Sequence, residues 1–334
     1  MKCLVTGPGG FLGRYIVEQL LARGDEVRGL ARGNYEELAA LGVEMRQGDL
    51  RDRKGVVEAC QGVDVVFHVA GLAGIWGAWK EYYEINTLGT QYVVEGCLQH
   101  GVQRLVYTST PSVTFDGSDQ CDVDETAPYP DHWLCHYPHS KALAERHVLQ
   151  ANGGTHAQGK LWTCALRPHL IWGPRDNHLI PRLVARARAG RLRQIGSGEN
   201  LIDSVFVTNA ATAHLQAADR LGPDSLVNGR AYFITQGEPV NCWAWINDIL
   251  ELTQLPRLTR RISARAAWRL GSVCETAYSL LRIRAEPPMT RFVAAQLSTS
   301  HYFNLTRARE DFSYAPAISH TEGMELLAQS LRKG

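Results

Sequence analysis

A tyrosine and a lysine, Tyr137 and Lys141, stand four residues apart at the start of a segment with helical apolar spacing. Residues four apart share one face of a helix. A nearby ammonium group favours the phenolate and lowers the pKa of a tyrosine, so this pair could transfer a proton near neutral pH. Taken alone, such a pair is usually an ordinary feature of an amphipathic helix, and its chemistry depends on the rest of the chain.

A glycine-rich stretch, Thr6 to Gly13, follows an apolar run and precedes a second run with helical spacing. Gly7, Gly10 and Gly13 would allow a tight reversal, close approach of the backbone to a pyrophosphate, and packing of the helix against a sheet. The free N–H groups of the helix N-terminus favour anions. The stretch therefore predicts a dinucleotide-binding turn.

Strand and helix patterns alternate from residue 1 to 173, which predicts a parallel, doubly wound α/β sheet of the Rossmann type. The expected strands are 2–6, 26–31, 43–46, 63–68, 104–107 and 162–166, and the expected helices begin at Phe11 and Tyr137 and cover about 54–60 and 83–100. Beyond Gly173 the alternation is less regular. We expect a Rossmann domain, 1–173 with 204–235, and a smaller interleaved C-terminal substrate domain, 174–203 with 236–334.

The order of these motifs resembles that of the extended short-chain dehydrogenases/reductases over nearly the whole chain. The resemblance includes Asp49-Leu50, His68 to Gly71, Asn86 to Thr90, Tyr107 to Val113 and Tyr137 to Lys141. Within that superfamily, Tyr107 to Thr110 and Tyr137 to Lys141 resemble the 3β-hydroxysteroid dehydrogenase branch.

The resemblance implies roles for the catalytic residues. Tyr137 would donate a proton to a carbonyl oxygen, Thr110 would hydrogen-bond that oxygen, Lys141 would bind the nicotinamide ribose, and Asn86 would organise the site. The implied cofactor-binding residues are Gly7, Gly10, Phe11, Leu12, Gly13, Asp49, Leu50, Val69, Ala70, Gly71, Tyr137 and Lys141.

The end of the second expected strand bears on the choice of cofactor. A carboxylate there would bind the ribose 2′-hydroxyl and repel a 2′-phosphate, but the chain offers Ala31 and then Arg32. The guanidinium of Arg32, with that of Arg28, would favour the phosphate of NADP(H). NAD(H) stays the alternative, because exposed arginines are common at strand ends.

Three tryptophans, Trp76, Trp79 and Trp172, fall in segments expected to face the substrate and could form an apolar slot. Arg182 is the first choice for a cation that binds a substrate carboxylate, although a solvated helix face explains it equally well. Pro111-Ser112 follows Thr110 where nucleotide-sugar dehydratases carry Asp-Glu, which disfavours dehydration.

Segments 73–79, 108–113 and 170–182 more narrowly resemble bacterial reductases of long-chain olefin biosynthesis. That resemblance implies NADP(H)-dependent reduction of a long-chain 2-alkyl-3-oxoalkanoate to the 3-hydroxy acid. A 3β-hydroxysteroid or sterol dehydrogenase is the nearest alternative. A non-catalytic regulator that senses NADP(H) is an alternative of another class.

Composition narrows the list of partners. A net charge of +1 over 334 residues, with dispersed basic residues, gives no reason to expect that the protein binds nucleic acid.

Segment 266–283 would be a buried helix or an amphipathic helix that contacts a membrane, a partner enzyme or an oily substrate. His132, Cys135, His136 and His139 are close in sequence, but we expect a substrate-side loop and no metal. The absence of a recognisable signal peptide predicts a cytoplasmic location, and the family resemblance implies a homo-oligomer.

Overall fold

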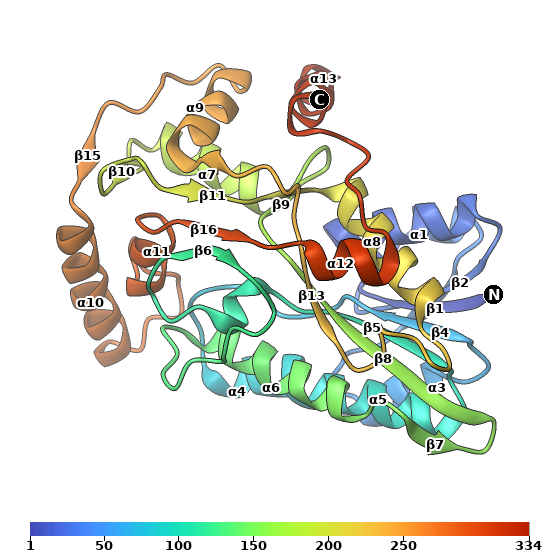
Figure 1. Ribbon diagram of the computed structural model, residues 1–334. Helices are drawn as coiled ribbons and strands as arrows, with labels where there is room; N and C mark the ends of the chain where they lie inside the picture. Colours follow the sequence, from blue (N-terminus) through green and yellow to red (C-terminus); the bar gives the residue numbers. More distant parts are fainter. Residues whose placement is uncertain (334) are drawn as a thin grey trace.

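The computed structural model describes residues 1–333 and has a parallel sheet at its centre, in the order β13-β8-β5-β4-β1-β2-β3 (Figure 1). Its strands are β1 (Lys2–Thr6), β2 (Glu26–Ala31), β3 (Glu44–Gln47), β4 (Val65–His68), β5 (Arg104–Thr108), β8 (Gly159–Pro168) and β13 (Ala231–Ile234), and β7 (Gly154–His156) pairs antiparallel with β8. The chain reverses its direction of winding between β1 and β4. Ligands of such sheets bind at this switch point, outside the carboxyl ends of the strands.

Helices cover both faces of this sheet (Figure 1). One face packs against α1 (Phe11–Ala22) and α8 (Val207–Arg220), and the other against α3 (Arg53–Ala59), α5 (Gly89–His100) and α6 (His136–Gln150). Both faces are apolar because successive side chains of a strand point to opposite faces of the sheet. In β1, Cys3 and Val5 belong to the first core and Leu4 belongs to the second. The predicted doubly wound α/β fold is confirmed.

A second group of short strands and helices is built on a separate apolar core. Its strands form the ladders β14-β11-β16-β6, β10-β15 and β12-β9. These are β6 (Gln120–Val123), β9 (Ile171–Trp172), β10 (Gln194–Ile195), β11 (Leu201–Ile202), β12 (Val205–Phe206), β14 (Val240–Asn241), β15 (Arg261–Ile262) and β16 (His301–Phe303). The helices are α7 (Leu179–Arg188), α9 (Cys242–Leu252), α10 (Ala264–Leu280), α11 (Arg291–Gln296) and α13 (His320–Lys333). The remaining C-terminal helix, α12 (Thr306–Phe312), packs on the first core instead, beside α8 and β13.

The chain enters and leaves the two groups more than once. After the short strands that follow β8, it returns to the central sheet at α8 and β13, and β13 pairs with β8. The domain limits proposed above stay a prediction. Within residues 1–333, none of the helices combines the length and apolar character needed to cross a bilayer.

One expected helix, 83–100, is longer and less regular than predicted. It begins as α4 (Trp79–Tyr82), passes through a π-helical turn at Tyr83–Leu88, and continues as α5. The remaining short helices are α2 (Glu36–Ala40) and a 3₁₀ turn at Pro111–Thr114. π-Helical turns occur frequently at functional sites, and this one carries Asn86.

Candidate active site

The reversal between β1 and α1 has a shape that glycine makes possible. Gly7 has φ +70°, a conformation that side chains disfavour. A Cβ atom at Gly13 would lie 2.1 Å from the carbonyl oxygen of Gly7, so the first turn of α1 packs directly on the loop backbone. The N-terminal amides of α1, which begins at Phe11 and Leu12 after Gly10, have no acceptors within the helix. The turn therefore fits a pyrophosphate.

The segment after β4 lies directly beside this turn. The Thr6 hydroxyl accepts hydrogen bonds from the amides of Val69 and Ala70, both at 3.1 Å. His68 Nδ1 lies 2.8 Å from the same hydroxyl. A Cβ at Gly7 would lie 3.1 Å from the Cα of Ala70, so the two segments form one continuous wall.

The ends of β2 and β3 form the other side of the expected cofactor site. Arg32 follows β2 and is exposed, and its carbonyl accepts a hydrogen bond from Gln47 Nε2 at 2.9 Å. Hydrogen bonds from Arg51 lower the pKa of Asp49 to about 2, and the positive charge of Arg32 adds to this effect. Leu50 is buried. A cation and a carboxylate thus stand side by side where an adenosine ribose would bind.

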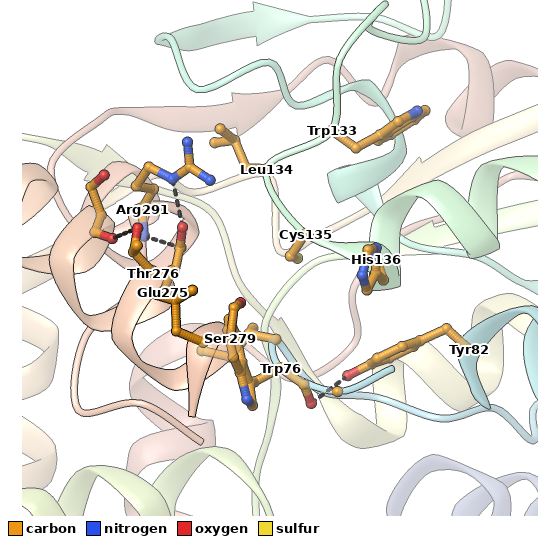
Figure 2. Close-up of a pocket in the computed structure, with 14 residues that line it drawn as sticks. Trp76, Tyr82, Trp133, Leu134, Cys135, His136, Glu275, Thr276, Ser279 and Arg291 are labelled. Atoms are coloured by element: carbon orange, nitrogen blue, oxygen red, sulfur yellow. Dashed lines mark hydrogen bonds and ion pairs between the residues drawn. The ribbon is translucent and has the colours of Figure 1, made fainter. Parts of the chain in front are cut away.

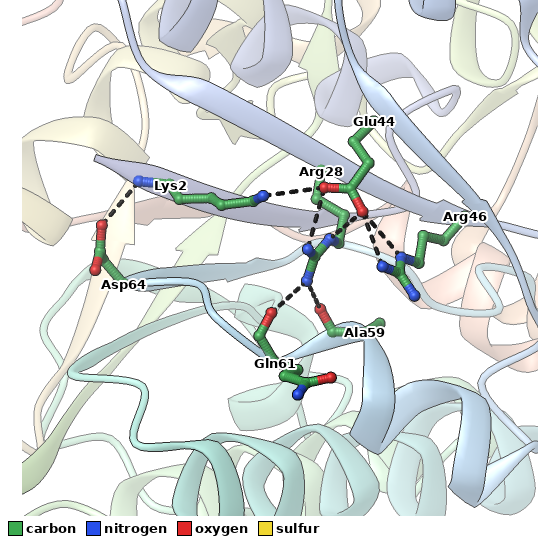
Figure 3. Close-up of polar contacts among 7 residues, drawn as sticks. All are labelled: Lys2, Arg28, Glu44, Arg46, Ala59, Gln61 and Asp64. Atoms are coloured by element: carbon green, nitrogen blue, oxygen red, sulfur yellow. Dashed lines mark hydrogen bonds and ion pairs between the residues drawn. The ribbon is translucent and has the colours of Figure 1, made fainter. Parts of the chain in front are cut away.

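Arg28 is not available to a cofactor phosphate, so this expectation was wrong. Its guanidinium binds both carboxylate oxygens of Glu44 at 3.0 and 3.1 Å and donates to the carbonyls of Ala59 and Gln61 (Figure 3). The side chain is almost completely buried. Arg28 lies in the middle of β2, and its guanidinium reaches the end of α3. The side chain therefore joins β2 to β3 and to α3.

Three of the four expected catalytic side chains come from two neighbouring elements. Thr110 lies two residues beyond β5, where its hydroxyl accepts a hydrogen bond from the amide of Ser112 at 3.3 Å. Tyr137 and Lys141 lie one turn apart on α6. Lys141 Nζ donates to the carbonyl of Thr108 at 2.6 Å and lies 4.2 Å from the centre of the Tyr107 ring.

The electrostatics of this group differ from the expectation. Burial raises the pKa of Tyr137 to about 12, and a hydrogen bond with Thr110 opposes this rise. Burial also lowers the pKa of Lys141 to about 7, while the charge of Glu145 acts in the opposite direction. The expectation that Lys141 lowers the pKa of the phenol is therefore wrong for this arrangement, because the lysine is directed to the end of β5 and is itself poorly solvated.

Asn86 connects the expected cofactor side of the site to α6. Its side-chain amide makes both hydrogen bonds to the backbone of Leu72, at 2.7 and 3.1 Å, and donates to Ser140 Oγ at 2.9 Å. A Cβ at Gly71 would lie 3.2 Å from Asn86 Oδ1 and 3.7 Å from Lys141 Nζ. The expected cofactor residue Gly71 thus meets two of the expected catalytic residues.

Ser140 lies within the Tyr137–Lys141 segment, and its role could not be predicted from the sequence. Its hydroxyl donates to the carbonyl of Tyr137 at 2.8 Å and accepts from Asn86, so it fixes the first turn of α6. The carbonyl of Ser140 accepts a hydrogen bond from Thr87. A serine in the first turn of a helix was the only available signal, and it is a common one.

A cavity of about 570 Å³ begins next to this group, between α10 and the two loops that contain Trp76 and Leu134 (Figure 2). Cys135 and His136, which directly precede Tyr137, lie on its wall. The opposite wall is α10 with Arg291, whose guanidinium is bound to Glu275 at 2.6 Å. The cavity therefore has one apolar wall and one wall whose charges, those of Glu275 and Arg291, neutralise each other.

The expected substrate residues are distributed unevenly around this cavity. Trp76 lines it and donates from its indole to the carbonyl of Ile283 at 3.2 Å. Trp79 instead stacks on His139, with ring centres 4.6 Å apart, and His139 stacks in turn on Trp133. Among residues 1–333, no three or more His, Cys, Asp or Glu side chains are grouped so that they could hold a metal ion.

Two of the expected substrate residues lie elsewhere. Trp172 is completely buried, donates to Ser204 Oγ at 3.0 Å and packs edge-to-face against Phe206 and Trp245. It is a core residue because β9 pairs with β12 instead of forming a loop. Arg182 lies on α7 and forms an ion pair with Glu286, outside the walls of the cavity.

Comparison with known proteins gives matches over nearly the full length. A model of the 3-beta hydroxysteroid dehydrogenase/isomerase family matches residues 4–260. The 2-alkyl-3-oxoalkanoate reductase of Shewanella oneidensis is 48% identical, with 98% of this chain and 85% of that protein covered. The protein of the same name from Stenotrophomonas maltophilia is 45% identical, with 99% of each covered.

A more distant relative and a solved structure extend this comparison. The sterol-4-alpha-carboxylate 3-dehydrogenase, decarboxylating, of Mus musculus is 35% identical, with 98% of this chain and 90% of that protein covered. The structure of MoeE5 in complex with UDP-glucose and NAD superimposes with a TM-score of 0.72 at 26% identity, with 100% of this chain and 99% of that chain covered.

Proposed function

Since this chain belongs to the 3β-hydroxysteroid dehydrogenase/isomerase family and is an oxidoreductase, we propose that it reduces a long-chain 2-alkyl-3-oxoalkanoate with NADPH. The product is the 2-alkyl-3-hydroxyalkanoate. The observation that carries this proposal is the near-full-length similarity to two bacterial proteins named for that reaction. The geometry supports it, since Tyr137 and Thr110 share a hydrogen bond and Cys135 and His136, which directly precede Tyr137, line a cavity with an apolar wall.

The proposed chemistry divides between the cofactor and the chain. NADPH, when bound, supplies the hydride that reaches the carbonyl carbon. Tyr137 donates its hydroxyl proton to the carbonyl oxygen, and Thr110 hydrogen-bonds the same oxygen and stabilises the charge that develops there. Lys141 would hold the nicotinamide ribose, and Asn86 and Ser140 position the turn of α6 that carries Tyr137.

The cofactor assignment rests on the end of β2. Arg32 is an exposed cation there, and none of the ion pairs among residues 1–333 uses its guanidinium. The neighbouring carboxylate of Asp49 is bound by Arg51 at 2.7 Å. A 2′-phosphate would therefore meet a free guanidinium, which favours NADP(H) over NAD(H).

The class of substrate follows from the cavity and from the names of the relatives. Ile75, Trp76 and Leu134 supply apolar surface for alkyl chains. The names of the bacterial and the mouse relatives both describe a carboxylate on the carbon adjacent to the one that is reduced or oxidised. A 3-oxo or 3-hydroxy acid with a large apolar part is thus the shared feature.

The second candidate is a sterol or 3β-hydroxysteroid dehydrogenase, which the family description and the mouse relative favour. It would use the same catalytic residues with a rigid polycyclic substrate. A regulator that only senses NADP(H) is the third candidate, but a sensor has no need of a tyrosine and a threonine placed to share a hydrogen bond.

The test is to incubate the protein with a racemic long-chain 2-alkyl-3-hydroxyalkanoate and NADP⁺ and to follow ketone and reduced cofactor. A 3β-hydroxysteroid with NAD⁺ or NADP⁺ is run in parallel. We expect turnover of the hydroxy acid with NADP⁺. Turnover of the steroid alone would contradict the proposed substrate, and cofactor binding without turnover of either would favour the sensor.

A further inference from the structure

The helix α10 presents its apolar residues to solvent. Ala266, Leu270, Val273, Ala277, Leu280 and Leu281 follow one another at spacings of three or four residues, with one adjacent pair at the end, and so form one face. Val273 is 67% exposed, Leu280 79% and Leu281 71%. We call these six residues the outer stripe.

The face of α10 that contacts the protein carries Ala267, Gly271, Glu275 and Tyr278, and the Tyr278 ring packs edge-to-face on Trp76. Gly271 is buried, and a Cβ there would lie 2.6 Å from the backbone of Thr290. Glu275 binds both the amide and the guanidinium of Arg291, at 2.7 and 2.6 Å. The carboxylate of Glu275 is therefore used inside the protein, while the leucines of α10 are left exposed.

Arginines stand at both ends of the outer stripe. Arg265 and Arg269 lie on its first turns, and Arg282 and Arg284 follow its last residue. All four are exposed, and no ion pair within residues 1–333 involves them. The nearby carboxylates do not neutralise them, since Glu275 is bound to Arg291 and Glu286 to Arg182 and Arg186.

We propose that α10 lies flat on the surface of a membrane that contains anionic lipids. The outer stripe would enter the boundary between headgroups and acyl chains, and the four arginines would contact lipid phosphates. The charge favours this occupant over a second copy of the chain, which would bring like-charged arginines together. The stripe is one helix wide and lies at the edge of the molecule, which suits a planar surface (Figure 1).

This position also links the membrane to the candidate active site. Thr276 and Ser279 of α10 line the cavity (Figure 2). Leu280, the outer-stripe residue near the end of the helix, also lines it, so the stripe reaches the mouth of the cavity. A substrate with long alkyl chains would partition into lipid and could pass along α10 into the cavity. This step rests on the proposed function, whereas membrane binding does not.

The test is co-sedimentation of the full chain with vesicles of phosphatidylcholine, with and without phosphatidylglycerol, in the absence of substrate and cofactor. We expect binding to the anionic vesicles that weakens with added salt. The double variant Val273→Glu, Leu280→Glu should bind them about tenfold less or weaker still, because carboxylates would enter the apolar layer. The double variant Arg265→Gln, Arg269→Gln should also bind less, while Leu226→Glu, which changes another exposed leucine outside α10, should bind as the unmodified chain does.

Several outcomes would overturn the proposal. These are no binding to anionic vesicles, equal binding to neutral ones, or equal binding by the Val273→Glu, Leu280→Glu variant. Light scattering tests whether a second copy of the chain covers the stripe instead. If the unmodified chain is a dimer and the Val273→Glu, Leu280→Glu variant is a monomer, a second copy covers the stripe and the proposal fails. Turnover of a hydroxy acid in detergent tests the proposed function separately, so either proposal can fail without the other.

Discussion

The ammonium group of Lys141 is buried, and its burial lowers the stability of the folded protein by an amount that depends on pH. Burial lowers its pKa to about 7 from an ordinary value of 10.5. Between these values the unfolded chain binds a proton that the folded chain does not, so stability rises with pH across that window. Below pH 7 the full cost of the buried charge is present. The site therefore carries a destabilising residue that its proposed chemistry requires.

The variant Lys141→Met tests this linkage. We compare the free energy of unfolding of the unmodified chain with that of the variant. The difference, unmodified minus variant, should increase by about 1 kcal/mol per pH unit between pH 7.5 and 9.5. Urea unfolding of both proteins at several pH values measures the difference, in which groups common to both cancel. A difference that stays constant over this range would show that Lys141 keeps its proton in the folded state.

Arg32 decides the cofactor in the proposed function. The variant Arg32→Asp should reduce kcat/KM for NADPH by about tenfold or more and raise that for NADH, because a carboxylate accepts from a ribose hydroxyl and repels a phosphate. Initial rates with the two cofactors measure the ratio. Arg188→Asp makes the same change of charge at another exposed arginine and should leave the ratio unchanged. An unaltered preference in Arg32→Asp would place the phosphate elsewhere.

At the scale of elements, the turn between β1 and α1 is the most constrained part of the site. In Gly13→Ala the new methyl group would lie 2.1 Å from the Gly7 carbonyl, so α1 must move away from the turn. We expect NADPH affinity to fall about tenfold or more, because the amides at the start of α1 are displaced. Fluorescence titration with NADPH measures this, together with thermal unfolding.

The control for that change is Gly222→Ala, since a Cβ at Gly222 would meet no atom within 4 Å. It should retain both stability and NADPH affinity. Unchanged affinity in a folded Gly13→Ala protein would show that the turn does not hold the cofactor.

Helices and strands could be predicted from the sequence where the spacing of their own apolar residues defines the buried face. The apolar periods of β1, α1, β2 and α6 fixed these elements closely, because each buries a face that its own sequence defines. The π-helical turn at Tyr83–Leu88 was not predicted, since its hydrogen-bonding pattern leaves no sign in apolar spacing. The role of Asn86 in joining Leu72 to Ser140 depends on that turn and needed the structure.

At the scale of the whole molecule, the failures concern residues whose environment is made by distant segments. Trp172 is enclosed by Phe206, Trp245 and His320, so its burial could not be inferred from its neighbours in sequence. Arg28 lies in the middle of β2, and its burial likewise depends on distant segments, since Glu44 of β3 and the carbonyl of Ala59 bind its guanidinium. The helix predicted at 266–283 exists, but which of its faces is covered depends on where Thr290 and Arg291 pack.

The fold brings the glycine turn before α1, the Arg32 end of β2 and the start of α6 with Tyr137 to the same edge of the sheet. The measurement that tests this account most directly is steady-state reduction and NADPH binding by Tyr137→Phe, with Tyr83→Phe as a matched loss of a nearby phenolic hydroxyl. We predict that Tyr137→Phe loses turnover by about a hundredfold to ten-thousandfold while it binds NADPH almost normally, and that Tyr83→Phe keeps its turnover. A Tyr137→Phe protein that reduces the 3-oxo acid at a normal rate would contradict the account.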